Sequence, residues 1–405
     1  MPTEPSRSGD PVDPGPTNQS GRPGRLDGMT KLPGSGLRSR IGAARRSRWD
    51  LLAVLPLALL AFAVVAAVGP PRSGPLALAL VLEVYLFILT FAVLAPIALL
   101  ARARLLGAAL LIVLVSGGAF FGSEWVSLPG SGATRHDLAV MTWNLQFGTR
   151  SPAQTAAELE GVNVDLIALQ ELEPDPSAAI ERDPIIAARY PYRAMAPGQM
   201  ASGVAILSRY PIEKVASTRD PSCLELIVDT PHGPIRVINA HPSHADISTV
   251  TPLRLPIDYN PSGRDAEVAT VRTRIEAAVA GGQRLLVLGD YNTTSSEPEY
   301  SVLTHGLRDT QVQVGEGPGW TWRPSRITFL PVAFLRIDLQ LTAGPIFPTS
   351  TSVDCSLPGD HCRLFGDYEI DGCRRRAETS RRAVDRRGNL LRRGPQDGVV
   401  RGYRN

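Results

Sequence analysis

Eight polar side chains stand where apolar runs of the sequence end, and their types suit the chemistry of phosphate groups. They are two amides, four carboxylates and two histidines: Asn144, Glu171, His241, Asp290, Asn292, Asp338, Asp360 and His361. Catalytic groups usually lie on loops that a rigid sheet positions. We therefore expect these side chains to converge in one polar site.

Oxygen ligands in this set favour a magnesium site. Mg²⁺ keeps several waters and binds through one or two carboxylates together with a substrate phosphate. Asn144, Glu171 and Asp360 offer such oxygens and are the predicted metal ligands. Mn²⁺ accepts the same kinds of ligand, so it is a possible substitute.

The other five residues are of the kinds that transfer or orient protons. A histidine beside an aspartate is held in one tautomer and becomes more basic. The predicted catalytic residues are His241, Asp290, Asn292, Asp338 and His361. Together with the metal ligands, they predict metal-assisted hydrolysis of a phosphate ester or anhydride.

Short apolar runs alternate with helical patterns between residues 136 and 373, which predicts an α/β catalytic domain over this range. The predicted strands cover residues 139–145, 165–170, 204–208, 224–229, 235–240, 284–289, 337–342 and 363–368. The predicted helices cover residues 153–160, 176–189, 264–280 and 296–303. This order predicts mixed sheets with helices on the outside.

Three apolar segments precede this domain and predict a membrane domain over residues 49–122. Its helices are expected at about 51–69, 76–100 and 105–121, and the first segment is long enough to span roughly 29 Å. Arginines cluster before the first segment and between the second and third. Because positive charge stays on the cytoplasmic side, we expect a multi-pass plasma-membrane protein with an extracytoplasmic catalytic domain.

Both ends of the chain have the composition of disordered segments. Residues 1–48 contain seven prolines and almost no aliphatic side chains, so they cannot bury enough apolar surface to fold. They are predicted to form a cytoplasmic tail. Residues 374–405 carry a net charge of +8 and are predicted to form a basic disordered tail.

The formal net charge of +3 conceals an acidic catalytic segment, because residues 136–373 sum to −11. A protein that holds nucleic acid normally needs a basic groove. The expected partners are therefore a lipid bilayer and a lipid-linked phosphorylated substrate, with nucleic acid less favoured. A surface-anchored nuclease stays open if four arginines line the mouth of the site: Arg254, Arg264, Arg323 and Arg326. A non-catalytic sensor is a third alternative.

Four cysteines, Cys223, Cys355, Cys362 and Cys373, lie after the apolar segments. An even number outside the cytoplasm is compatible with disulfides. Cys355 and Cys362 are close enough in sequence to pair, but three connectivities are possible for four cysteines.

Seven motifs in order resemble the signature of the endonuclease/exonuclease/phosphatase (DNase I-like) superfamily: MTWNL, LQELEP, SGVAILSRYPI, NAHPSH, LGDYNTT, LRIDL and GDHC, within residues 138–371. The resemblance implies a four-layer α/β sandwich, in which two mixed sheets pack face to face between helices. It implies Glu171 as the main Mg²⁺ ligand, with Asn144 and Asp360 nearby.

The same resemblance implies roles for the remaining site residues. Asp290 and Asn292 would orient the attacking water and the phosphoryl oxygens. His361, held by Asp338, and His241, on the opposite side, would form a pair whose division between base and donor stays open. Two positions depart from the usual pattern: Gly359 stands where the family commonly has Ser, and Leu339 where many bacterial members have His. These departures put the fine positioning of the site in question.

Two further residues, Trp322 and Arg336, are predicted to contact substrate. Trp320 and Trp322 with residues 327–335 would form either an apolar rim that grips lipid or part of the site wall and core. The layout of three apolar segments followed by an exterior domain resembles the membrane-anchored VanJ-like subgroup, for which a polyprenyl pyrophosphate is the implied substrate class.

Overall fold

The computed structural model describes residues 48–125, 136–251 and 255–370. All of the elements below belong to one compact unit that begins at Trp49. The predicted tails, apart from Arg48, lie outside the described residues, as do Cys373 and Arg254.

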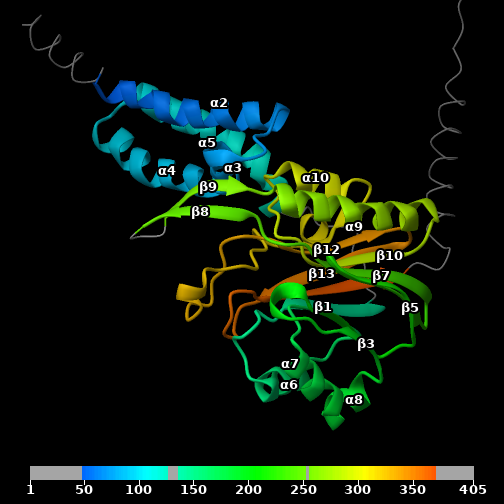
Figure 1. Ribbon diagram of the computed structural model, residues 1–405. Coiled ribbons are helices and arrows are strands. Elements are labelled where there is room, and N and C mark those ends of the chain that lie inside the picture. The colour runs from blue at the N-terminus through cyan, green and yellow to red at the C-terminus, as the bar shows by residue number, and fades with distance from the viewer. Residues whose placement is uncertain (1–47, 126–135, 252–254, 371–405) are drawn as a thin grey trace, which may run out of the picture. The chain divides into compact units, whose positions relative to one another are not determined.

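The apolar N-terminal part is helical (Figure 1). It comprises η1 (Leu51–Ala53), α2 (Val54–Val68), α3 (Gly74–Val81), α4 (Glu83–Leu100) and α5 (Arg104–Trp125). Two helical stretches, Arg48–Val68 and Glu83–Leu100, are long and apolar enough to cross a membrane by length and composition. The apolar part of the third, Arg104–Ala119, is shorter. Two of the three predicted spans therefore meet this criterion.

The second predicted span, residues 76–100, is not one continuous helix. Leu82 has φ −96° and ψ 11°, which ends α3 and lets α4 start at Glu83. Helix α3 then packs against a β-hairpin of the catalytic part. Apolar composition alone does not mark such a break, because both sides of it are equally apolar.

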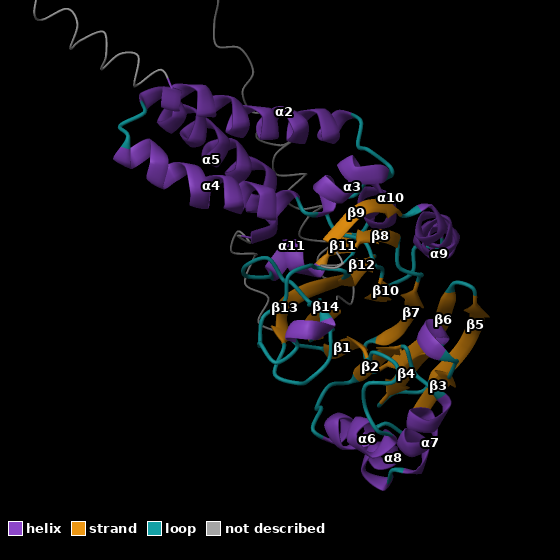
Figure 2. Ribbon diagram, turned by 60° about the vertical axis from the view of Figure 1, so that its left-hand side comes forward, coloured by secondary structure: helices purple, strands orange, loops and turns teal. Residues whose placement is uncertain are grey.

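Two six-stranded mixed sheets form the centre of the catalytic part (Figure 2). The first sheet has the order β13 (Ile346–Asp354), β14 (Arg363–Ile370), β1 (Leu138–Asn144), β2 (Leu166–Gln170), β4 (Val204–Ser208) and β3 (Tyr192–Ala196). The second has the order β11 (Arg308–Asp309), β12 (Asp338–Ala343), β10 (Leu285–Asp290), β7 (Gly233–His241), β6 (Ser222–Thr230) and β5 (Ile212–Arg219). Pairs β1/β2 and β7/β10 are parallel.

The sheets pack face to face, because side chains of both contribute to one buried cluster that includes Val140, Leu166, Val237 and Leu286. Helices α6 (Pro152–Glu160), α7 (Pro174–Arg182) and α8 (Pro184–Arg189) cover the outer face of the first sheet. Helices α9 (Ser262–Ala280) and α10 (Pro298–Thr304) cover that of the second. This is the four-layer α/β sandwich that the motifs implied.

The central strands are apolar on both faces because each face is covered. On β1, Val140 points into the core between the sheets, while Met141 and Trp143 point to the helices outside. This alternation follows the two-residue period of a strand. It explains why the predicted strands read as short continuous apolar runs.

Several elements differ from the sequence prediction. The predicted helix 176–189 is two helices, α7 and α8, because Pro184 follows Asp183 and disfavours helical backbone there. Strands β3, β5, β11 and β13 were not predicted; they are the four edge strands of the two large sheets. A separate hairpin, β8 (Asp246–Val250) and β9 (Leu255–Asn260), was also not predicted.

Candidate active site

All eight predicted polar residues lie at one end of the two sheets. Asn144 and His241 are the last residues of β1 and β7, and Asp290 is the last residue of β10. Asp338 is the first residue of the antiparallel strand β12 and lies directly opposite Asp290. The carboxyl ends of parallel strands and the start of an antiparallel strand meet at the same edge, which is why residues nearly 200 positions apart converge.

Asn144 connects the two sheets within the site. Its amide nitrogen donates to Glu171 Oε1 and to Asp290 Oδ2, both at 3.0 Å. Its own oxygen accepts the backbone N–H of Gln146 at 2.9 Å. The second oxygen of Glu171 accepts the backbone N–H of Phe147 at 2.9 Å. One buried amide therefore orients a carboxylate from each sheet.

Three residues of the site have left-handed backbone, namely Gln146 with φ 54°, Glu171 with φ 55° and Asn292 with φ 51°. This conformation is unfavourable for residues with a side chain and persists where the surroundings fix it. For Asn292, the backbone N–H donates to Asp290 Oδ1 at 2.9 Å. Strained backbone is thus concentrated where the predicted metal ligands and phosphate-orienting groups lie.

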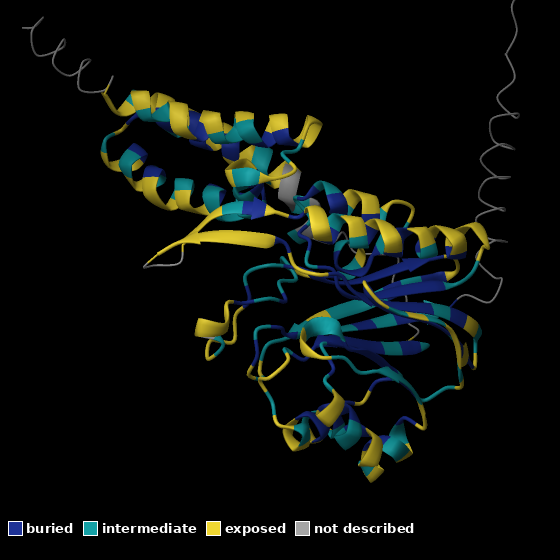
Figure 3. Ribbon diagram, in the orientation of Figure 1, coloured by how far each residue is buried: buried dark blue, intermediate teal, exposed yellow. Residues whose placement is uncertain are grey.

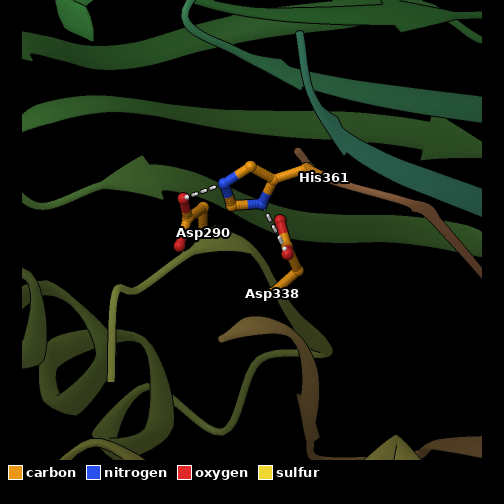
Figure 4. A group of neighbouring side chains, drawn as sticks. All are labelled: Asp290, Asp338 and His361. Carbon is orange, nitrogen blue, oxygen red and sulfur yellow. Dashed lines mark hydrogen bonds and ion pairs between the residues drawn. The ribbon is translucent and has the colours of Figure 1, made fainter. Parts of the chain in front are cut away.

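Asp290 lies between the two histidines of the site. Its Oδ2 is 3.5 Å from His241 Nε2 and 3.5 Å from His361 Nε2. His361 Nδ1 is 2.9 Å from Asp338 Oδ2, so its ring lies between two carboxylates (Figure 4). His241 Nδ1 is 2.9 Å from the carbonyl oxygen of Ala201, which as an acceptor requires the proton on Nδ1 and directs Nε2 into the site.

The aspartates and histidines of this group stabilise each other's charged forms. Burial alone would lower the pKa of His361, but the charges of Asp338 and Asp290 outweigh burial and raise the pKa to about 10. Burial also opposes the charge on His241, yet its interaction with Asp290 raises the pKa above the ordinary value. Burial would raise the pKa of Asp290, but His361 and His241 hold it below its usual range. At neutral pH the site therefore holds the His361 imidazolium beside the ionised Asp290, and Asp290 also favours the protonated form of His241.

Asp360, the residue before His361, lies close enough to Glu171 for the two carboxylates to interact. Its Oδ1 is buried and accepts no hydrogen bond from the described residues. Its backbone N–H donates to Gln146 Oε1 at 3.0 Å. Burial raises the pKa of Asp360 above its usual range and the charge of Glu171 adds to this, although His361 opposes it. An unpaired oxygen next to a second carboxylate is an arrangement that a divalent cation stabilises.

A second grouping of possible ligands was not predicted as a metal site. Within the described ranges, Asp290, Asp338 and His361 have donor atoms that all lie within 4.8 Å of one another. Within this group, the hydrogen bond between His361 Nδ1 and Asp338 Oδ2 fixes the orientation of the imidazole ring. This buried group could hold a metal ion, and it differs from the predicted ligand set of Glu171, Asp360 and Asn144.

The loop that carries Asp360 and His361 is closed by a disulfide between Cys355 and Cys362. This is the pair that the sequence made plausible among three connectivities, and Cys223 is free and buried. Arg323, which is fully buried, binds the same loop by donating to the carbonyl oxygens of Leu357 at 2.6 Å and Gly359 at 2.9 Å.

The two departures from the family pattern have structural explanations. Gly359 has φ 125°, a conformation that favours glycine over serine, and a Cβ there would lie 2.7 Å from a guanidinium nitrogen of Arg150. Leu339 is buried in the apolar core of the second sheet, so a histidine is not needed there to complete the site. Neither departure displaces a predicted ligand.

The predicted substrate residues lie in different surroundings. Trp322 is half-buried and pairs through its backbone with both Leu335 and His361, so it lies beside the site. Arg336 is buried and its guanidinium is 2.7 Å from Asp309, away from the predicted ligands. The structure therefore brings Trp322 to the catalytic group but engages Arg336 in an internal ion pair.

Two of the four arginines that a basic nuclease mouth would need are buried. Arg264 is 1% exposed and pairs with Glu297 and Asp265 at 2.7 Å. Arg323 is 0% exposed and binds backbone carbonyls. Arg326 is exposed, and Arg254 lies outside the described residues. Neither Arg264 nor Arg323 is therefore free to line the mouth of the site.

Sequence reasoning missed several supporting residues. Gln146, Arg323 and Arg264 each hold a catalytic segment through a backbone group; Arg264, for example, donates to the carbonyl oxygen of Asn292 at 2.7 Å. Gln170 links the sheets by donating to Asn239 Oδ1 at 2.7 Å. No local pattern marks such residues, because each acts on a segment that is distant in sequence.

Comparison with known proteins identifies the family. The sequence profile described as the Endonuclease/Exonuclease/phosphatase family matches residues 141–361, more than half of the chain. No curated protein matches the chain.

Several solved structures are similar to the catalytic part. An endonuclease/exonuclease/phosphatase from Beutenbergia cavernae is 21% identical over 59% of this chain and 72% of that one, with a TM-score of 0.44. A 3′ phosphatase from Neisseria bound to product DNA hairpin is 19% identical over 58% and 100% of the two chains, with a TM-score of 0.42. A sphingomyelinase C from Streptomyces griseocarneus is 15% identical over 57% and 98%, with a TM-score of 0.39.

The matched segment begins on β1 and ends at His361, so it contains every residue predicted above to bind metal or to take part in catalysis. The chain therefore belongs to the endonuclease/exonuclease/phosphatase family.

Proposed function

We propose that this protein is a membrane-anchored, Mg²⁺-dependent phosphohydrolase whose catalytic domain lies outside the cytoplasm and cleaves a lipid-linked phosphoester or pyrophosphate. Phosphoester hydrolysis is the chemistry of its family. The observation that carries the proposal is the placement of Asp290 Oδ2 3.5 Å from the Nε2 atoms of both His241 and His361. It combines a carboxylate that can orient water with two donors for a phosphoryl group.

The residues present fit a divalent cation. Glu171, Asp360 and the amide oxygen of Asn144 would hold it, because Asp360 Oδ1 has no hydrogen-bond partner among the described residues and is repelled by Glu171. Hard oxygen ligands of this kind suit Mg²⁺, with Mn²⁺ as a substitute. When bound, the cation supplies Lewis-acid stabilisation of negative charge on the phosphoryl oxygens.

The side chains of the chain would share the remaining steps. Asp290, whose pKa is held low, is ionised at neutral pH and can orient a water for attack. His241 keeps one proton on Nδ1 for the Ala201 carbonyl, so in the imidazolium form its Nε2–H can donate to a phosphoryl oxygen. Asn292 donates to the Pro242 carbonyl at 3.0 Å, which holds it beside His241. His361, fixed by Asp338, would donate from the other side.

Membrane attachment supports a lipid-linked substrate. The helical stretch Arg48–Val68, which contains α2, and helix α4 pass the length and composition criterion. Helix α5 extends over 22 residues, about 33 Å at the helical rise, of which Arg104–Ala119 is the apolar part. Three crossings and the arginine distribution would place the catalytic domain outside. The net charge of −11 over residues 136–373 and the buried state of Arg264 and Arg323 disfavour a polyanionic substrate.

The proposal can be tested by substrate comparison. The full-length chain is reconstituted in liposomes and incubated with Mg²⁺ and, in parallel, a polyprenyl pyrophosphate, sphingomyelin and duplex DNA. We expect phosphate release from the polyprenyl pyrophosphate, loss of activity with EDTA and recovery with Mg²⁺. His361→Asn is the matched inactive control. Cleavage of DNA alone would favour the surface-anchored nuclease, and no hydrolysis of any phosphate compound would favour a non-catalytic sensor.

A further inference from the structure

We propose that two apolar segments beside the active site, the hairpin β8–β9 and residues 328–332, insert into the surface of the lipid bilayer on either side of the site and admit a membrane-borne substrate between them. We call them the hairpin lip and the loop lip. This inference rests on the proposed function, because it assumes that α2 and α4 lie in the bilayer.

The hairpin lip exposes apolar side chains that a two-stranded ribbon in water would not present. Ile247, Val250, Leu255 and Ile257 are all exposed, with Leu255 at 56%. Figure 3 shows strand β8 in the colour of exposed residues. The hairpin forms a two-stranded sheet of its own, separate from the two large sheets. Isolated hairpins are marginally stable in water, and exposed apolar strands are an aggregation hazard. Helix α3 covers part of β9, and an apolar phase would cover the side chains of the ribbon that remain exposed.

The apolar residues of the hairpin point to both of its faces. Ile247 lies opposite Tyr259, and Val250 lies opposite Leu255. The extra residue at the register shift is on β9, so Ile247 and Val250, three positions apart on β8, point to opposite faces. A protein partner docked on one face would leave the other uncovered. A fluid lipid phase covers both faces at once.

The base of the hairpin is fixed to the helical part. Tyr259 is buried in a cluster with Ala77 of α3 and Ala245, and α3 packs along β9. Helix α3 ends at Val81, and only Leu82 separates it from α4, which begins at Glu83. The hairpin therefore leaves the protein at the end of a candidate membrane span.

The loop lip is attached at the same end of the same span. Phe329 is 78% exposed, and Leu330 and Val332 are exposed beside it. The segment is held by Tyr85, in the first turn of α4, whose hydroxyl donates to the carbonyl oxygen of Phe334. The ring of Tyr85 also lies 5.7 Å from that of Trp320. Aromatic side chains of this kind are favoured at the membrane–water interface.

Both lips are continuous with the active site. Strand β8 begins five residues after His241, and the intervening Pro242 carbonyl accepts the side-chain N–H of Asn292. On the other side, Trp322 pairs with both Leu335 and His361. The hairpin lip thus follows the strand that ends at His241, and the loop lip belongs to a segment that is bridged to His361 through Trp322. A lipid-linked phosphate held at Asp290 would extend its apolar chain between them.

The lips can be tested by site-specific labelling of the full-length chain in phosphatidylcholine/phosphatidylglycerol liposomes. Ile257→Cys and Phe329→Cys are labelled with the environment-sensitive fluorophore NBD in a Cys373→Ser background, because Cys223 is buried. Ile185→Cys is the matched control. Ile185 is also an exposed isoleucine, but it lies on α8, which covers the outer face of the first sheet, away from the lips.

We expect doxyl-labelled phosphatidylcholine to quench NBD at positions 257 and 329 at least fivefold more than at 185, and aqueous iodide to show the opposite order. Iodide quenching at 257 and 329 equal to that at 185 would refute the inference. Labels shielded from both quenchers would also refute it, since a second protein copy would then cover the lips. These outcomes do not depend on catalysis, so they are separate from failure of the proposed function.

A second measurement links the lips to substrate entry. In the double variant Ile247→Asp/Ile257→Asp, we expect hydrolysis of a polyprenyl pyrophosphate in liposomes to fall at least tenfold more than hydrolysis of a water-soluble nitrophenyl phosphodiester. Ile185→Asp should change the two rates by the same factor. Equal losses on both substrates in the hairpin variant would show that the lips do not serve the membrane-borne substrate.

Discussion

Gly289 and Ala240 lie opposite each other on the parallel strands β10 and β7, and a Cβ on Gly289 would be only 1.9 Å from the Ala240 carbonyl oxygen. Gly289 has φ 135°, which residues with a side chain rarely adopt. The two residues directly precede Asp290 and His241. The absence of a side chain at position 289 thus permits the close approach that brings the carboxylate to the histidine.

Gly289→Ala should reduce kcat by about a hundredfold or more and destabilise the domain by about 2–4 kcal/mol, because the new methyl group meets backbone and the φ value is strained. Gly282→Ala is the control, since Gly282 also has a positive φ of 65° but open space around it. Steady-state kinetics and thermal unfolding of both variants separate the effect of a positive φ, which both positions share, from the contact of the new methyl group with the Ala240 carbonyl, which occurs only at position 289. Similar activity in the two variants would show that the 289–240 approach is not needed for catalysis.

Asp338→Asn and Glu171→Gln should change different kinetic quantities, the first kcat and the second the Mg²⁺ requirement. Asp338 orients His361 through a 2.9 Å hydrogen bond, so its loss should lower kcat by about 10²–10⁴-fold with the Mg²⁺ requirement unchanged. Glu171→Gln removes a proposed ligand charge and should raise the Mg²⁺ concentration for half-maximal activity by about 10–100-fold. Mg²⁺ titrations of both variants check this. A shifted Mg²⁺ requirement in Asp338→Asn would instead place Asp338 among the metal ligands.

The raised pKa of His361 predicts a pH-dependent contribution to stability. Its folded-state pKa of about 10 exceeds the ordinary value of 6.5, because Asp338 and Asp290 favour the cation more than burial disfavours it. The stabilisation is therefore complete below about pH 6.5 and is lost as the pH rises through about 10. In EDTA, the Tm difference between wild type and His361→Gln should be largest at pH 6 and should narrow towards pH 10. A difference that does not vary with pH would contradict the assignment of the charge to this residue.

Opening the disulfide should loosen the loop that carries Asp360 and His361. For the double variant Cys355→Ser/Cys362→Ser, loop-closure entropy predicts a loss of about 2–3 kcal/mol in unfolding free energy. Activity should also fall, because only hydrogen bonds, including those of Arg323, Arg150 and Gln146, then hold the loop. Cys223→Ser is the control for a buried thiol outside the loop. Unchanged activity in the double variant would show that the hydrogen bonds to the loop suffice without the disulfide.

Tyr85→Phe should weaken the attachment of the site wall to α4. It removes the hydroxyl that donates to the Phe334 carbonyl, a bond worth about 1 kcal/mol. We expect proteolysis of residues 328–332 to become several times faster in liposomes, with the fold otherwise intact. Tyr192→Phe, at an exposed edge strand, is the control. Equal cleavage rates in the two variants would contradict the role of Tyr85.

The features that could be predicted from the sequence are those that appear as local patterns of apolar and polar residues. Buried strands such as β2 and β10 appear as apolar runs, and the polar residue at the end of each, Glu171 or Asp290, stands out against them. Convergence then follows from the parallel and antiparallel order of the strands. The family motifs supplied the roles that local chemistry left open.

What could not be predicted depends on contacts between distant segments. Arg323 was considered as a surface charge, yet it is fully buried because the carbonyls of residues 355–359 surround it. Arg336 was considered for substrate binding, yet Asp309, on a strand too short to recognise, pairs with it. The lone hairpin β8–β9 was missed because its apolar residues cover no core. In each case the residue is visible in the sequence, but the distant segment that contacts it cannot be predicted from local patterns.

The Cys355–Cys362 bond also bears on when the enzyme becomes competent. Thiols stay reduced in the cytoplasm and oxidise outside it. If the catalytic domain is exported as proposed, a newly made chain would carry an open loop, with Asp360 and His361 not yet locked beside Glu171. Oxidation after translocation would complete the site. Export would then act as a maturation step that keeps the hydrolase from attacking phosphorylated metabolites inside the cell.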